Sequence, residues 1–186
     1  MALEVVDTAR RALVPHRRVP RFGRGVPAAL LGAVLLTGAC DSQPKATRTI
    51  EQTVAPAEQV LIRTANGAVT LRTDSALTNG TAVATVVARG ATTAEAEQRV
   101  QAVVLRSEME DGRLVIEPVF PTPRGSNEGA SLVVTMPSLT GAEVVTSNGV
   151  VIVEGVAGDV NVVTSNGRLE LSRIGGAVSA TSSNGR

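Results

Sequence analysis

Few side chains in this sequence of 186 residues could carry out covalent or acid–base chemistry. The only cysteine, Cys40, supplies the single thiol, and the only histidine, His16, supplies the single imidazole. Cys40 directly follows Leu36-Thr37-Gly38-Ala39, so a nucleophilic sulfur stands after two small residues. One cysteine excludes an internal disulfide. The other candidates are carboxylates and a recurring Asn-Gly pair.

The residues before Cys40 have the three parts of an export signal. Six arginines come first, an apolar run over residues 26–36 follows, and small residues end the segment. The apolar run is shorter than the ~20 residues needed to span a bilayer as a helix. We therefore expect residues 1–39 to be a cleaved signal peptide.

The run Leu36-Thr37-Gly38-Ala39-Cys40 resembles the lipobox of bacterial lipoproteins, with Thr37 where that pattern prefers leucine. The resemblance implies that the thiol of Cys40 is acylated and that the peptide bond before it is cut. The alternative is an incidental thiol beside an ordinary cleavage site. Acyl chains would hold the mature protein on the outside of a bacterial membrane, inner or outer.

The charge of the mature part argues against nucleic acid as a partner. Past Ala39 the chain has twelve lysines and arginines and fifteen aspartates and glutamates, a net charge of −3. A nucleic-acid surface needs clustered positive charge and usually stacking aromatics. The only aromatic residue past Ala39 is Phe120, which also leaves no pattern of rings for stacking on sugars. The core must be built from aliphatic side chains.

Local patterns predict mostly strands. Residues 40–56 are polar and contain two prolines, which predicts a flexible tether. Apolar runs at 60–62 and 68–71 flank Asn66-Gly67 and predict a hairpin. Further strands are expected at 81–88, 103–108, 113–119 and 131–136, with Asp111-Gly112 as a second hairpin turn. Thr92 and Glu95 form a capping box that predicts one helix ending near Gln101.

The most informative pattern is an internal repeat. Three four-residue copies end in Asn-Gly at an interval of 18 residues: Asn148-Gly149, Asn166-Gly167 and Asn184-Gly185. Superposition aligns Val151 with Leu169 and Val153 with Leu171, whereas Ile152 aligns with Glu170. Because strand side chains alternate, Val151 and Val153 should point inward and Ile152 outward.

These observations predict an all-β fold that ends in a β-solenoid, of the right-handed β-helix type, with about two 18-residue coils. We divide the mature chain into a β-rich part with one helix at 57–137 and solenoid repeats at 138–186. Asn and Gly suit the corners, and stacked asparagines can form hydrogen-bonded ladders. Arg186 aligns with the start of a further strand, so we expect the natural chain to continue.

From about Val60 onward the chain resembles the bacterial putative-adhesin family of β-strand-repeat proteins, domain of unknown function 4097. Asn66-Gly67, the run Leu132-Val133-Val134-Thr135-Met136-Pro137 and the Thr-Ser-Asn-Gly repeats carry the resemblance. It implies a β-helix, often on envelope proteins. It brings no catalytic residues to this sequence.

The residues also argue against catalysis, metals and cofactors. His16 lies in the segment removed on export, and Cys40 would be acylated, so triads and thiol catalysis have no candidates. Across the repeats Asp159 aligns with Ala177 and Glu154 with Ser172, so no acidic column forms. Glu108, Glu110 and Asp111 fit a solvated turn, and the glycines fit corners rather than a phosphate loop.

The leading hypothesis is a non-enzymatic envelope lipoprotein that offers an adhesin-like scaffold or binding surface to a protein or wall component. One alternative is a regulatory partner in envelope-stress signalling. Another is a β-helix enzyme that acts on polysaccharides.

Overall fold

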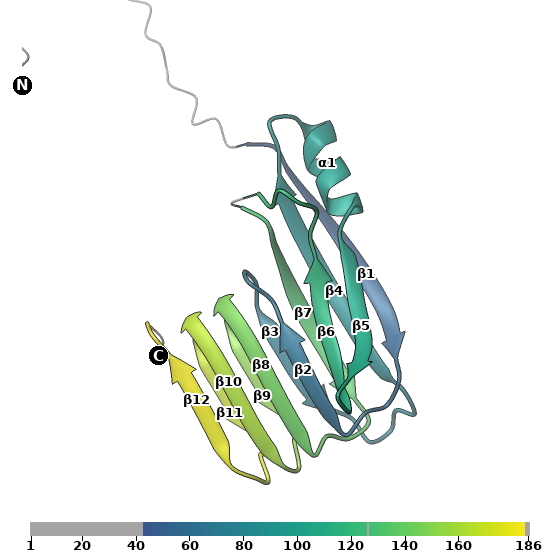
Figure 1. Cartoon of the computed structure of the whole chain (residues 1–186), viewed down its shortest axis with the longest axis vertical. Helices are drawn as coiled ribbons and strands as arrows, with labels where there is room; N and C mark the ends of the chain where they lie inside the picture. The colour runs from purple at the N-terminus through teal and green to yellow at the C-terminus, as the bar shows by residue number, and fades with distance from the viewer. Residues whose placement is uncertain (1–42, 126, 185–186) are drawn as a thin grey trace, which may run out of the picture. The chain divides into compact units, whose positions relative to one another are not determined.

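The computed structural model describes residues 43–125 and 127–184. The predicted signal peptide, the predicted lipidation site Cys40 and the corner residue Gly185 lie outside these ranges. Within them, thirteen elements form two six-stranded sheets and one helix (Figure 1). Their bounds are β1 Lys45–Val54, β2 Gln59–Arg63, β3 Val69–Thr73, β4 Gly80–Arg89, α1 Thr93–Gln101, β5 Val104–Glu110, β6 Arg113–Val119, β7 Gly129–Met136, β8 Gly141–Asn148, β9 Val151–Glu154, β10 Asp159–Asn166, β11 Leu169–Ser172 and β12 Val178–Ser182.

The two sheets face each other across an aliphatic core. The first sheet has the strand order β1-β4-β7-β3-β9-β11, and the second has the order β12-β10-β8-β2-β6-β5. Inward-facing residues of both sheets pack into one cluster that includes Val60, Ile62, Val69 and Leu71. The all-β prediction is confirmed for the described residues. No helix among them is long and apolar enough to cross a membrane.

Strands separated by one repeat lie side by side in parallel. Val160 of β10 pairs with Val178 of β12, and Leu169 of β11 pairs with Val151 of β9, each at an offset of 18 residues. The alternation also agrees with the prediction, because Val151 and Val153 are fully buried and Ile152 is half-buried. The period in the sequence therefore corresponds to the spacing of neighbouring strands.

The same parallel stack includes β2 and β3, which come much earlier in the chain. β2 pairs in parallel with β8, and β3 pairs in parallel with β9. The hairpin predicted at Asn66-Gly67 is therefore wrong: this turn passes from the second sheet to the first. An Asn-Gly turn is compatible with a hairpin and with a crossing from one sheet to the other. The partner strands, about 82 residues further along the chain, determine which of the two forms.

Strand pairing crosses the predicted boundary between residues 137 and 138. The described residues past Ala39 belong to one compact unit, in which β2 and β3 pair with β8 and β9. Residues 74–140 are an insertion between the first pair of stacked strands and the second. The insertion's β4 and β7 extend the first sheet beyond β3, and its β5 and β6 extend the second beyond β2.

The flexible tether predicted for residues 40–56 is wrong over Lys45–Val54, which form β1. β1 pairs antiparallel with β4 along its whole length, from Lys45 opposite Arg89 to Val54 opposite Gly80. Its inward side chains include buried Ala46 and Val54 and half-buried Ile50. The predicted tether lacked an apolar period because Arg48 and Gln52 occupy inward positions between those residues. Arg48 donates hydrogen bonds to the carbonyls of Val100, Gln101 and Val103 at the end of α1.

The single helix was predicted closely. The hydroxyl of Thr92 accepts a hydrogen bond from the backbone N–H of Glu95 at 3.1 Å, and the Glu95 carboxylate accepts one from Ala91 at 2.8 Å. The helix ends at Gln101 as expected. It buries Ala96 and Val100 against β1 and β4.

Candidate functional site

The repeated asparagines form a ladder along the corners of the stack. The side-chain amide of Asn184 donates to Asn166 at 3.0 Å, Asn166 donates to Asn148 at 2.9 Å, and Asn148 donates to Asn66 at 2.7 Å. The sequence pattern predicted structural corners at Asn148, Asn166 and Asn184. It did not identify Asn66 as the first residue of the ladder. The ladder uses the amides to bind one another, which is a structural role.

The glycine after each asparagine allows the corners to approach closely. Gly149 has φ +140, and a side chain there would overlap the carbonyl oxygen of Gly67. Gly167 makes the same approach to the carbonyl of Gly149. Below the corners, the hydroxyls of Thr146 and Thr164 are buried without a hydrogen-bond partner. These residues therefore serve the packing of the stack.

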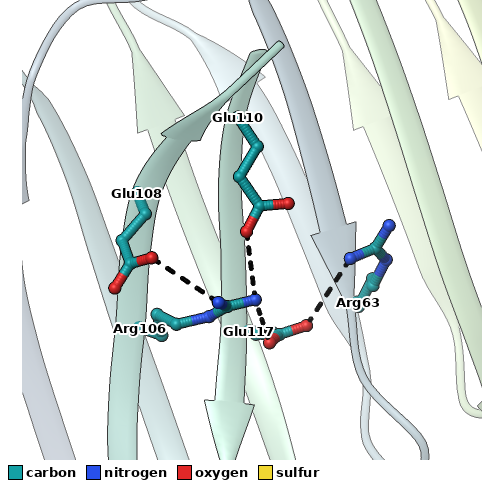
Figure 2. Close-up of polar contacts among 5 residues, drawn as sticks. All are labelled: Arg63, Arg106, Glu108, Glu110 and Glu117. Atoms are coloured by element: carbon teal, nitrogen blue, oxygen red, sulfur yellow. Dashed lines mark hydrogen bonds and ion pairs between the residues drawn. The ribbon is translucent and has the colours of Figure 1, made fainter.

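A cluster of charged side chains lies on β2, β5 and β6, on the outer face of the second sheet (Figure 2). The guanidinium of Arg106 contacts Glu117 at 2.5 Å, Glu110 at 3.3 Å and Glu108 at 3.5 Å. Glu117 also lies 3.9 Å from Arg63 on β2. Arg113, at the start of β6, binds Glu143 of β8 at 2.9 Å. We call this set the charged face; its residues are Arg63, Arg106, Glu108, Glu110, Arg113, Glu117 and Glu143.

The electrostatic surroundings keep Arg106 positively charged. Partial desolvation lowers its pKa, but the carboxylates of Glu117, Glu110 and Glu108 together outweigh that effect, so its pKa is raised above the ordinary value. Each of the three carboxylates is in turn held against the same cation. This arrangement is a network of ion pairs within the chain.

Two apolar residues lie beneath the charged face. Leu61 and Val115 are 2% and 1% exposed, although their neighbours Val60, Ile62, Leu114 and Ile116 form the inner core. The long charged side chains around them cover them with their aliphatic stems. Further apolar residues on this face are partly or largely exposed: Val104, Val119, Val145 and Val163.

Sequence reasoning assigned Glu108, Glu110 and Asp111 to a solvated turn and missed the cluster. Asp111 has φ 49 and Gly112 φ 79, and this two-residue turn fixes the register of β5 and β6. That register places Arg106 opposite Glu117, a pairing that the Asp-Gly turn alone could have predicted. No local signal indicates Arg63, because β2 pairs with β6 across a long stretch of chain.

A second polar cluster ties the helix to the loop before β7. Glu128 is 2% exposed, and its carboxylate accepts hydrogen bonds from Arg99 at 2.5 Å and from the backbone of Gly125 at 2.8 Å. Arg99 also donates to the carbonyl of Pro123. A buried carboxylate satisfied in this way is a clamp between elements.

Three carboxylates of the repeats each make a separate contact. Asp159 accepts a hydrogen bond from the backbone of Ala177 at 2.8 Å, which attaches one repeat to the next. Glu154 and Glu170 pair with Arg173 and Arg168. Within residues 43–125 and 127–184, no three aspartates or glutamates are grouped so as to hold a metal ion.

Several solved structures are distantly similar to this chain. No protein-family model and no curated protein matches this chain. A putative cell adhesion protein from Clostridium sporogenes is 10% identical, with TM-score 0.44, over 75% of this chain and 97% of that one. A putative adhesin from Parabacteroides distasonis is 14% identical, with TM-score 0.39, over 75% of this chain and 66% of that one. A putative lipid binding protein from the same species is 10% identical, with TM-score 0.32, over 71% of this chain and 67% of that one.

Proposed function

We propose that this protein is a bacterial envelope lipoprotein, anchored through Cys40, that binds another envelope component without catalysing a reaction. The run Leu36-Thr37-Gly38-Ala39-Cys40 supports the anchor. The described fold supports the binding role, because its parallel strands form a stiff frame with a large outer face. The polar side chains described above form ion pairs and structural hydrogen bonds.

We further propose that the parallel strands are the coils of a β-solenoid. The pairs β2/β3, β8/β9 and β10/β11 would be three successive coils, and β12 would begin a fourth. The constant offset of 18 residues between the last coils and the asparagine ladder along all of them support this reading. Such a stack holds outward side chains at fixed spacings of ~4.8 Å.

The charged face is the candidate binding surface, and one observation carries the proposal. Charges of both signs lie over buried Leu61 and Val115, beside exposed Val163 and Val104. Apolar positions surrounded by charged and polar groups are typical of a protein–protein interface. A protein partner in the envelope fits this surface best, and a wall component is the other candidate.

Site-specific crosslinking tests the surface. A photoreactive amino acid replaces Val163 of β10, on the same side as the charged face, in one variant and Val150, directly before β9, in the other. These residues are 38% and 37% exposed, so the two positions are equally accessible to a partner. We expect a discrete adduct from position 163 in intact cells and little from position 150. Equal adducts from both, or none from position 163, would contradict the proposed surface.

The identity of the adduct separates the possible roles. A surface protein or wall polymer supports the scaffold role, whereas a sensor kinase or transporter would favour regulation of envelope stress. Glycan cleavage that is lost when one glutamate of the charged face is changed to glutamine would overturn the non-enzymatic proposal.

Metabolic labelling tests the anchor separately. Radiolabelled palmitate should be incorporated into the full chain and should disappear in Cys40→Ala. Label that persists in this variant would refute the lipoprotein assignment, whatever the crosslinking shows.

A further inference from the structure

A basic hollow lies close to the proposed anchor. β1 begins at Lys45, five residues after Cys40, so the Cα atoms of these two residues are at most about 18 Å apart even if the chain is fully extended. Lys45 pairs with Arg89 in the β1–β4 register. Both face away from the core, since the adjacent Ala46 and Ala88 are buried. If Cys40 carries acyl chains, these two cations must lie near the bilayer surface.

The cations border a hollow of about 440 Å³ on the outer face of the first sheet. Thr85, Ser131, Asn66 and Asn127 also line it. Gly129 forms part of its floor, and a side chain there would come within 2.5 Å of the carbonyl oxygen of Asn66. The absence of a side chain lets the backbone of Gly129 pack against that carbonyl. The hydroxyls of Thr85 and Ser131 and the amide of Asn127 around the hollow offer hydrogen-bond donors.

The positive charge of the hollow is not neutralised from within the described part of the chain. Neither Lys45 nor Arg89 has a carboxylate within ion-pair distance there, and the one side-chain hydrogen bond of Arg89 goes to the carbonyl of Gln43 at 3.1 Å. The carboxylate of Glu128, whose residue borders the hollow, is already bound by Arg99 and Gly125. Arg124 adds a further exposed cation to the same loop.

We propose that this hollow receives the phosphate of an anionic lipid headgroup in the membrane that holds Cys40. Lysine and arginine both bind phosphate, the arginine through two parallel N–H groups. Basic residues close to a membrane are attracted to anionic lipids. The domain would then lie against the bilayer at the start of β1 and the end of β4. This inference rests on the lipid anchor of the proposed function.

Fluorescence quenching in vesicles tests the contact. The full chain is expressed with its signal, purified in detergent and reconstituted into vesicles with quencher-bearing lipids. A fluorophore is attached to Asn127→Cys beside the hollow or, as the distant control, to Thr140→Cys in the turn before β8. We expect strong quenching at position 127 in phosphatidylglycerol vesicles. Little is expected at position 140, or at either position in pure phosphatidylcholine.

Charge removal then tests the two cations. Lys45→Gln/Arg89→Gln should abolish the quenching at position 127. The matched variant Arg72→Gln/Arg168→Gln removes two exposed cations, one on β3 and one directly before β11, and should preserve the quenching. Circular dichroism checks that both variants fold. Unchanged quenching in Lys45→Gln/Arg89→Gln would overturn the proposal, as would equal loss in both variants.

Free phosphate and a missing anchor each give a distinct result. Saturable binding of inorganic phosphate, together with equal quenching in both types of vesicle, would assign the hollow to free phosphate and reject the lipid. A chain that does not float with the vesicles lacks the acyl anchor. The absence of flotation would refute the proposed function. A chain that floats with the vesicles but shows no quenching would overturn the lipid contact alone.

Discussion

Asn148 is a middle rung of the asparagine ladder. It donates one side-chain hydrogen bond to Asn66 and accepts one from Asn166, whereas Asn184 makes only one. We expect Asn148→Ala to lower the free energy of unfolding by about 1–3 kcal/mol, since it loses two such bonds and each contributes about 0.5–1.5 kcal/mol. Asn184→Ala should cost about half as much. Urea titration measures both, and equal losses would contradict a ladder of equivalent rungs.

Thr164 presents the opposite case, because its buried hydroxyl has no partner. Replacing it with valine removes an unsatisfied polar group while keeping the shape, so Thr164→Val should leave stability unchanged or raise it by up to about 1 kcal/mol. Thr64 is the control, since its hydroxyl donates to the carbonyl of Ala130 at 3.1 Å. Thr64→Val should destabilise by about 1 kcal/mol. Thermal denaturation distinguishes them, and a destabilised Thr164→Val would show that its hydroxyl is bonded.

At the scale of the elements, a turn can require glycine because of a positive φ, because of a close approach to another backbone, or because of both. Gly149 combines a positive φ with a close approach to Gly67, whereas Gly112 has a positive φ but open space around it. Gly112→Ala should therefore cost about 1 kcal/mol, the conformational penalty alone. Gly149→Ala should cost about 3 kcal/mol or more, because the corner must also open. Similar losses of unfolding free energy for the two would argue against close stacking of the corners.

The alternation within β9 is also measurable. Val153 is fully buried, and its neighbour Ile152 is half-buried on the outer face. Val153→Asn should lower the free energy of unfolding by about 3 kcal/mol or prevent folding, since it leaves an amide in the core. Ile152→Asn should cost about 1 kcal/mol. Soluble yield and urea midpoints report the difference, and equal tolerance of the two changes would refute the assignment of the inward and outward faces.

The elements that sequence patterns predicted well are those fixed by near neighbours. The capping box of Thr92 and Glu95 and the turn at Asp111-Gly112 each set their structure within a few residues. β1 was missed because Arg48, which caps the end of α1, interrupts its apolar pattern. A side chain with that role is recognisable only once the helix is in place.

The candidate sites were less predictable, for a similar reason. The corners at Asn148, Asn166 and Asn184 follow from the period of 18 residues. The charged face and the basic hollow instead bring together residues that are far apart in the chain, such as Arg63 with Glu117. Exposed polar residues carry no periodic signal that would reveal such pairings.

At the scale of the whole molecule, the first sheet runs without interruption from β1 to β11. The helical end and the repeats therefore share one sheet and one core, and we expect a single cooperative unfolding transition. The chain has no tryptophan or tyrosine. Circular dichroism can follow the strands while a fluorophore on Asn127→Cys follows the helical end. Midpoints that differ would show that the repeats unfold independently.

The insertion of residues 74–140 has a consequence for the order in which the protein folds. Contacts among β8, β10 and β12 close loops of 18 residues, whereas β2 must find β8 across about 82 residues. The longer closure costs about 1.3 kcal/mol more in chain entropy. β2 and β3 leave the ribosome before β8 and β9 have been synthesised. Until β8 and β9 arrive, their apolar faces need protection, so the period after synthesis is when this protein is most exposed to aggregation and to chaperones.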